Sequence, residues 1–201
     1  MQPRLFDGGA MNLPAYLSWP GKSAAGPDLP EHPAVYHMLD VAAVAERLIA
    51  PFGFSRALAE ALVLLTALHD LGKISAVFRG VLRDGRSQGW KHWQITEALL
   101  RHHDGLLGAR LVGGWRQRRQ LYAAAAGHHG RPPALSDHDL KRAHDACGGE
   151  AVADAGVAID ALAALWPQAS LVELDKKAAV ALSWWLPGLV TAADWIGSNA
   201  A

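Results

Sequence analysis

The chain has 201 residues, about half of them apolar and eight of them tryptophan, which is enough for a single large domain with a sizeable core. Its 19 basic and 19 acidic residues cancel, so no bulk charge attracts nucleic acid and any such site must be a local patch. The single cysteine, Cys147, excludes an internal disulfide framework and a zinc site built from cysteines.

The spacing of apolar residues predicts helices along most of the chain. Residues 1–33 are rich in proline and glycine and predict an irregular lead-in, and turn or loop residues gather at 84–89 and 131–139. The first predicted helix runs from Val41 to a stop at Pro51, and the second covers 55–70 with Ser55 as its cap. A third covers 91–103, and a fourth runs from Trp115 to a stop at Gly127 or Gly130. Two weaker helical stretches cover 137–148 and 150–166, and the last helix covers 171–197.

Two of these helices have features that bear on the core. The helix at 55–70 is apolar on most of its circumference, which predicts a central position. The last helix is expected to kink at Pro187 and to turn five residues toward the core: Leu182, Leu186, Leu189, Val190 and Ala193. Strand patterns are nearly absent. The sequence therefore predicts an all-α protein with one domain over residues 1–201.

No apolar run approaches the roughly 20 residues that a membrane span needs. The N-terminal residues show neither the apolar core nor the cleavage pattern of a secretory signal. Together with the lone cysteine, these features predict a soluble cytoplasmic protein with no membrane partner.

Ionisable residues end or interrupt several of the apolar helical stretches. A single histidine on an apolar helix is more often a hydrogen-bonded core residue than a ligand, and the His144-Asp145 pair lies in a polar segment that needs no special role. The segment "GHHG" at 127–130 is different, because two adjacent imidazoles between glycines contribute little packing. The full set is His37, His69, Asp70, His92, His128, His129 and Asp194.

Taken together, this set predicts a metal centre. Imidazole and carboxylate ligands without thiolates suit Fe, Mn, Co or Ni, with Zn or Mg also possible. Five histidines and two aspartates exceed the needs of one four-coordinate ion, which suggests two divalent ions. Asp70 could bridge a pair about 3.5–4 Å apart, as in hydrolysis at phosphorus. Lys73 lies one turn further and is either a catalytic cation or an ordinary surface lysine at a helix end.

The segments "LHDLGK", "GHHG" and the late aspartate, with histidines before and between them, resemble the HD superfamily of metal-dependent phosphohydrolases. With "YHMLDVAAVAERL" and "AADWIGSN", the resemblance narrows to the HD nuclease domain of the CRISPR-associated type I effector helicase-nuclease, especially its type I-E branch. It extends from about Trp19 to Asn199. It implies cleavage of single-stranded DNA with two transition-metal ions, beside a helicase and the CRISPR surveillance complex.

The resemblance also assigns roles to residues. It implies that His37, His69, Asp70 and Asp194 hold one ion, and that Asp70, His92, His128 and His129 hold the other. Asp70 and Lys73 would be catalytic, and Ser198 would meet a phosphate.

The histidine between "HD" and "GHHG" is not unique. His92, followed by Thr96, fits the family pattern best, but His102 and His103 compete for the same place. The alternative for His102 and His103 is an exposed helix C-terminus, where imidazoles are favourable.

A single strand of DNA needs cations for its backbone and aromatic side chains for its bases. The stretch "GGWRQRRQLY" supplies Arg116, Arg118 and Arg119 near Trp115 and Tyr122, and Lys91, Trp93 and Arg101 could add to it. The alternative is a solvated helix face with Trp115 and Tyr122 turned inward.

The family's helicase is absent from this sequence, since no phosphate-binding loop of the G-x-x-x-x-G-K-[ST] type occurs. The chain is therefore expected to be an excised domain or a nuclease subunit that works beside a separate helicase. Two other functions remain open at this point. One is an HD phosphohydrolase for small nucleotides, and the other is a silent metal-stabilised module that docks a partner.

Overall fold

The computed structural model describes residues 13–23, 31–85, 89–130 and 132–199. Within these ranges the chain is one helical domain with a short antiparallel pair of strands, which confirms the predicted all-α class. Parts of the predicted lead-in (1–12 and 24–30), of the turn (86–88) and of the loop (131) lie outside the described residues. The helices are α1 (Ala34–Ile49), α2 (Arg56–Ala67), α3 (Ala76–Asp84), α4 (His92–His102), α5 (Asp104–Leu111), α6 (Trp115–Ala126), α7 (Asp137–Cys147), α8 (Gly149–Ala163) and α9 (Lys176–Asn199).

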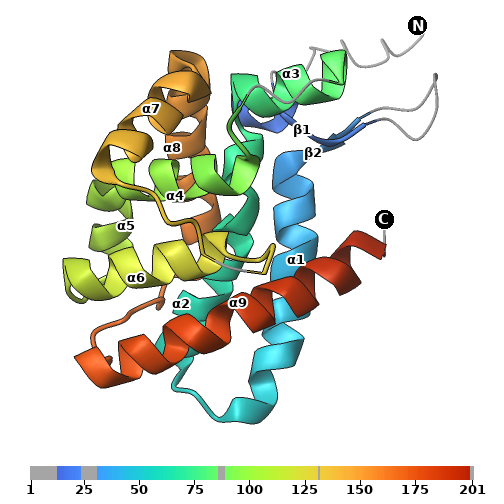
Figure 1. Cartoon of the computed structure of the whole chain (residues 1–201). Coiled ribbons are helices and arrows are strands. Elements are labelled where there is room, and N and C mark those ends of the chain that lie inside the picture. Colours follow the sequence, from blue (N-terminus) through green and yellow to red (C-terminus); the bar gives the residue numbers. More distant parts are fainter. Residues whose placement is uncertain (1–12, 24–30, 86–88, 131, 200–201) are drawn as a thin grey trace, which may run out of the picture.

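Helix α2 lies at the centre of the fold, as its apolar circumference predicted. Its Leu62, Leu64 and Leu65 are fully buried, and it packs against α1, α6, α8 and α9. The hydroxyl of Ser55 accepts a hydrogen bond from the backbone N–H of Leu58 and caps the helix, also as predicted. Figure 1 shows α9, in red, crossing α1 and lying beside α6 on the outside of this core.

The second predicted helix does not stay α-helical to its end. After Ala67 the chain tightens into the 3-10 segment η3 (Leu68–Lys73), where Asp70 leaves the helical region with φ −109° and ψ 21°. Shorter 3-10 turns, η1 (Ala15–Ser18) and η2 (Ala50–Phe52), flank α1 in sequence. The 3-10 path of η3 matters because it carries the "LHDLGK" side chains into the protein interior.

Helix α1 begins at Ala34, seven residues before the predicted start at Val41. Its first turns continue the buried face through Val35 and Met38, which the prediction overlooked because charged and aromatic residues interrupt them. The earlier start places His37 on a rigid helix.

Helix α9 begins at Lys176 and not at residue 171. The backbone N–H of Leu171 is held by the Leu111 carbonyl, and the Asp175 side chain accepts a hydrogen bond from the Ala178 N–H in the first turn. The helix runs through Pro187 without ending. All five residues predicted to face the core are buried: Leu182, Leu186, Leu189, Val190 and Ala193.

Two helices and two strands lack a counterpart in the sequence-based prediction. Helix α3 buries only Val77 completely, and α5 contains two glycines, which are weak helix formers. The strands β1 (Pro20–Lys22) and β2 (His32–Pro33) are too short to give an alternating pattern. Each of these elements depends on tertiary packing more than on local preference.

Among the described residues, α9 is long and apolar enough to cross a membrane by length and composition alone, and the bent α2–η3–α3 segment would be a second candidate if it were one span. This finding differs from the prediction that no segment reaches that length. A helix that packs in a soluble core passes the same test, and α9 packs against α1 and α6.

Candidate metal centre

The "HD" pair lies at the deepest part of the fold. Because η3 continues directly from the buried helix α2, His69 and Asp70 are only 0% and 2% exposed. The His69 Nδ1–H donates to the Thr66 carbonyl across 2.9 Å. Since a carbonyl can only accept, Nδ1 carries a proton, and Nε2 turns toward the acidic groups of the centre.

The two carboxylate oxygens of Asp70 face different groups of histidines. Its Oδ2 lies 3.1 Å from His37 Nε2 and 3.4 Å from His69 Nε2. Its Oδ1 lies 3.3 Å from His92 Nε2 and 3.4 Å from His128 Nε2. One carboxylate therefore stands between two sets of imidazoles, which is the arrangement that a bridging ligand requires.

Helices α1 and α9 complete the first of these sets. His37 Nε2 also lies 3.2 Å from Asp194 Oδ1, and His69 Nε2 lies 3.8 Å from the same oxygen. A Cβ atom added at Gly197 would come within 3.2 Å of the Val41 backbone, so this glycine lets α9 approach α1 closely. The close crossing brings the Asp194 carboxylate to His37.

Ser198 supports the carboxylate of Asp194. Its hydroxyl donates to Asp194 Oδ1 across 3.0 Å, and its carbonyl accepts a hydrogen bond from Lys22 Nζ. The side chain is only partly buried, and its phosphate contact stays a prediction.

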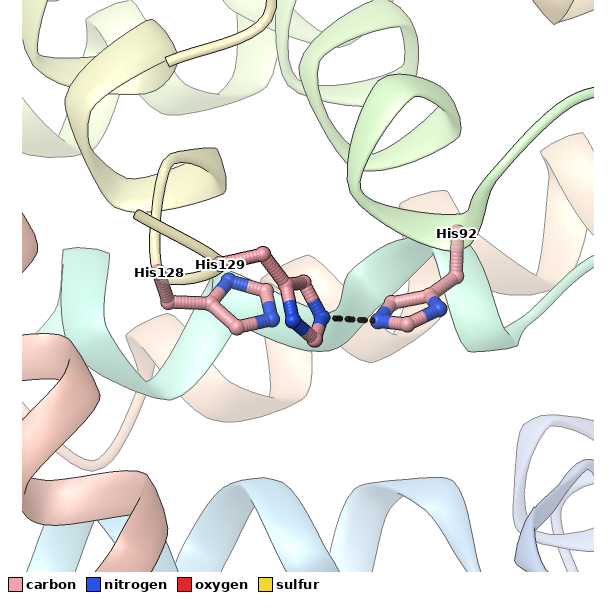
Figure 2. A group of neighbouring side chains, drawn as sticks. All are labelled: His92, His128 and His129. Carbon is pink, nitrogen blue, oxygen red and sulfur yellow. Dashed lines mark hydrogen bonds between the residues drawn. The ribbon is translucent and has the colours of Figure 1, made fainter. Parts of the chain in front are cut away.

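The second set comes from the start of α4 and the turn after α6. Figure 2 shows His92 pointing toward His129, with His128 beside them, and the Nε2 atoms of His92 and His129 are 3.0 Å apart. The Thr191 hydroxyl of α9 donates to the His128 carbonyl and ties the "GHHG" turn to α9. Ligand atoms of His92, His128 and His129 all lie within 4.8 Å of one another.

His102 and His103 lie away from this centre. The His103 ring donates to the Val152 carbonyl of α8, and His102 stacks on His144 of α7 with ring centroids 4.3 Å apart. Of the competing histidines, the structure thus brings His92 to Asp70 and uses the other two in packing at the end of α4.

Thr96 and Gly72 fix the position of His92. The Thr96 hydroxyl accepts the Gly72 N–H across 2.8 Å, and a Cβ atom at Gly72 would lie 1.9 Å from the His92 carbonyl oxygen. The glycine of "LHDLGK" therefore allows the start of α4 to rest on η3.

Replacing Gly72 by alanine is expected to push α4 away from η3. The added methyl meets backbone that has no flexible end to move, so the free energy of unfolding should fall by about 3 kcal/mol or more. Metal bound at the His92 group should fall as well. Gly188→Ala is the matched control, since nothing lies within 4 Å of a Cβ there. Thermal unfolding and metal analysis of both variants test this, and equal stability of the two would contradict it.

Charge in the centre favours a cation. Burial alone would raise the pKa of Asp70, but His69, Lys73 and His92 hold it well below its ordinary value. Burial would also raise the pKa of Asp194, but the nearby rings of His37 and His69 hold it below its ordinary value. Burial would lower the pKa of His69, but the two carboxylates raise it to about 9. Positive charge is thus stabilised between Asp70 and Asp194.

Two rings of the second set, His92 and His129, favour the neutral form. Burial, helped by nearby His128 and Lys73, lowers the pKa of His92 to about 4. Burial and His128 also lower the pKa of His129. Neutral imidazoles keep the lone pair that metal binding needs, so these rings are in the correct protonation state for ligands.

The donor set fits divalent metal ions. Among the described residues, His69 Nε2, His128 Nδ1 and Asp70 Oδ1 are buried atoms without a hydrogen-bond partner. Buried polar atoms are rarely left unpaired, and two of these atoms face the centre. The residues that could hold ions fall into three overlapping groups: His92, His128 and His129; His37, His69 and Asp70; and His69, His128 and Asp194.

Lys73 is not a surface lysine. It is 8% exposed, and its Nζ lies 2.7 Å from Asp70 Oδ2 and 5.7 Å from the centre of the Phe78 ring. The ammonium group therefore lies beside the Asp70 carboxylate, and its catalytic role stays a prediction.

The arginine stretch divides into exposed and buried members. Arg116 and Arg119 are exposed on α6. Arg118 is 9% exposed, and its guanidinium binds both carboxylate oxygens of Asp104 across 2.7 Å and the Gly113 carbonyl. Tyr122 is turned inward and donates to the same Asp104. The predicted DNA contact of Arg118 is therefore corrected, because its donors are used to hold α5 against α6.

Sequence reasoning did not single out Thr66 or Thr191, whose oxygen atoms orient His69 and His128. Both lie within apolar helical stretches and carry no motif, so only their proximity to the histidines in the fold reveals them.

Comparison with known proteins gives one family. Residues 19–201 match the family model described as Cas3, HD domain. A search of curated proteins found no match.

Several solved structures have a similar fold. A structure described as a CRISPR-associated protein is 26% identical with a TM-score of 0.71, over 92% of this chain and 23% of that chain. The Thermus thermophilus cas3 HD domain in the presence of Ni²⁺ is 24% identical with a TM-score of 0.60, over 89% of this chain and 75% of that one. A CRISPR RNA-guided surveillance complex in a pre-nicking state is 19% identical with a TM-score of 0.65, over 90% and 24%. The chain therefore spans less than a quarter of the length of two of these three proteins.

Proposed function

The chain belongs to the Cas3 HD-domain family, and from this membership and its histidine–aspartate centre we propose that it is a metal-dependent nuclease that cuts single-stranded DNA in CRISPR interference. The observation that carries the proposal is the position of Asp70, whose two oxygens face two sets of imidazoles. The T. thermophilus cas3 HD domain was crystallised in the presence of Ni²⁺, which supports a divalent transition metal here.

The proposed ligands follow the two sets. His37, His69 and Asp194 would hold one ion, His92, His128 and His129 would hold the other, and Asp70 would serve both. When bound, divalent ions at such a centre supply Lewis-acid stabilisation of negative charge at phosphorus and make water more acidic. Fe, Mn, Co or Ni fit this nitrogen-rich set best, and Zn or Mg are further candidates.

The protein's own groups prepare the site for a phosphodiester. Thr66 orients His69 and Thr96 positions the start of α4, so the ligands are held by rigid elements. The Lys73 ammonium would partly neutralise a phosphate that replaces its contact with Asp70. Because the Asp70 carboxylate is ionised and buried, it would hold cations strongly at neutral pH.

The proposed partners are a helicase, as a domain or a separate subunit, and the CRISPR surveillance complex. The family membership and the similarity of fold to a chain of the pre-nicking surveillance complex support both. A motor that delivers unwound strand would also explain why a chain of zero net charge needs little intrinsic affinity for DNA.

A circular single strand separates this function from its alternatives. With Mn²⁺, Co²⁺ or Ni²⁺ and no ATP, the chain should linearise circular single-stranded DNA, leave intact duplex largely uncut and lose all activity in EDTA. A circle has no end and contains no free nucleotide. Faster hydrolysis of free nucleotides than of the circle would establish the small-nucleotide phosphohydrolase instead, and no turnover with any of these metals would indicate a silent docking module.

Arg116 and Arg119 are proposed to contact the DNA backbone. Replacing both by alanine should weaken binding of single-stranded DNA and reduce the slope of log K against log salt by roughly 1.4, since each phosphate contact contributes about 0.7. Metal content should not change. Binding isotherms at several salt concentrations measure this slope.

Arg118→Ala is the matched comparison for that experiment. It should lower the free energy of unfolding by about 3 kcal/mol, because Asp104 is left without its main partner. Its effect on the salt slope should be small. A change in slope for Arg118→Ala with none for the double variant would place the DNA path elsewhere.

A further inference from the structure

Two cavities adjoin Trp93 at the start of α4. One of about 350 Å³ is lined by Trp93, Lys91, Gln94 and His129, together with Pro132 and Pro133. The other, of about 230 Å³, is lined by Trp93, Lys91 and His92, with Phe78 and Trp90. The indole of Trp93 and the side chain of Lys91 are common to both linings.

Each cavity reaches the metal centre through a different histidine. His129 lines the first cavity and His92 lines the second, and the Nε2 atoms of these two residues are 3.0 Å apart. Both cavities therefore open beside the same point, where the second set of proposed ligands gathers. A group bound in either one would lie next to a phosphodiester at that point.

The linings suit flat aromatic ligands. Trp93 lies with its ring centroid 4.4 Å from that of His129, and Phe78 is 5.6 Å from His92. Prolines and aromatic rings present π or C–H faces on which any nucleobase can stack, without the hydrogen-bond pattern that would select one base. Lys91, which is exposed, adds positive charge near the mouth of both cavities.

We propose that two successive nucleobases of a single strand occupy these cavities, one on each side of Trp93, and that this places the phosphodiester between them at His92 and His129. The inference rests on the proposed function and adds a means of positioning the strand. A single nucleotide would fill one cavity, whereas a strand fills both. Paired bases are held within a duplex and cannot separate around an indole, so the same device excludes intact duplex.

Abasic strands provide the test. Two short fluorescent oligothymidylates are compared: one is intact, and the other has two adjacent abasic positions at its centre. Binding of each strand is titrated with the EDTA-treated chain. KM for each strand is measured with the metal-loaded chain. The intact strand should bind about tenfold or more tightly than the abasic strand. Trp93→Ala should lose this preference by binding both strands with the weaker affinity, and Trp93→Phe should recover part of it. Trp184→Ala, which removes an indole that is 83% exposed on α9 and lines neither cavity, should behave as wild type.

The outcomes separate this inference from the nuclease proposal. If wild-type chain cuts circular single strands but binds abasic and intact strands equally, the base-binding role of Trp93 is wrong and the nuclease function stands. If Trp93→Ala binds more weakly but keeps the full preference for intact strands, Trp93 only positions the His129 ring and does not contact a base. The inference then also fails. If the chain neither binds nor cuts single strands, both proposals are wrong. The comparison of strands on wild-type chain remains decisive even if Trp93→Ala does not fold.

Discussion

Asp70→Ala is expected to abolish cleavage and to lower the metal content at both proposed sites. Both oxygens of this carboxylate face histidines, at 3.1–3.4 Å, so its loss removes a ligand from each set. The rate on single-stranded DNA should fall more than about 1,000-fold, as expected for a group on which a whole centre depends. Cleavage assays and metal analysis on the purified variant measure the two effects.

Two other aspartates serve as controls for Asp70. Asp194→Ala should lose chiefly one ion, because Asp194 contacts His37 and His69 but none of the second set at hydrogen-bond distance. Asp145→Ala removes an exposed carboxylate that pairs with His144 and Lys141, and should leave rate and metal content unchanged. Near-normal cleavage by Asp70→Ala would overturn the assignment of the centre.

His92→Ala is expected to reduce cleavage more than about 100-fold while leaving the fold intact. His92 stands at the start of α4, 17% exposed at its side chain, so its removal takes away a proposed ligand without opening a deep cavity. Metal at the second set should fall, and metal at the first set should be retained. The measurement pairs cleavage rate with metal content and thermal unfolding.

The His102→Ala, His103→Ala double variant is the comparison that isolates His92. It removes a stacked ring and one hydrogen bond to Val152, which should cost about 1–2 kcal/mol of stability and little activity. An inactive double variant beside an active His92→Ala would show that the intermediate ligand has been misassigned.

Much of the site could be predicted from local sequence. His69, Asp70 and Gly72 lie in one short motif at the end of an apolar helix, and their burial follows from that helix being central. The "GHHG" segment is likewise recognisable, because paired imidazoles between glycines have no packing purpose. These features depend on residues that are near one another in the chain.

The features that could not be predicted depend on contacts between distant elements. The sharing of Asp70 between two sets was implied by the family resemblance, but local sequence alone does not give it, because it requires the positions of α1, α4, α9 and the turn after α6 together. The predicted DNA contact of Arg118 was wrong because its partner, Asp104, lies 14 residues earlier in the chain. Asp104 begins helix α5, which the sequence did not predict. Lys73 has a local cause instead: its burial follows from η3 being wound as a 3-10 segment, which the helical spacing did not predict.

We propose that this centre needs two divalent ions to cut single-stranded DNA. Titrating Mn²⁺ or Ni²⁺ into chelator-treated chain, with bound metal and cleavage of circular single strands followed in the same samples, tests it most directly. We predict that cleavage rises with occupancy and saturates at two ions per chain, and that Asp70→Ala binds neither ion tightly. Full activity at one ion per chain, or two tightly bound ions in Asp70→Ala, would contradict it.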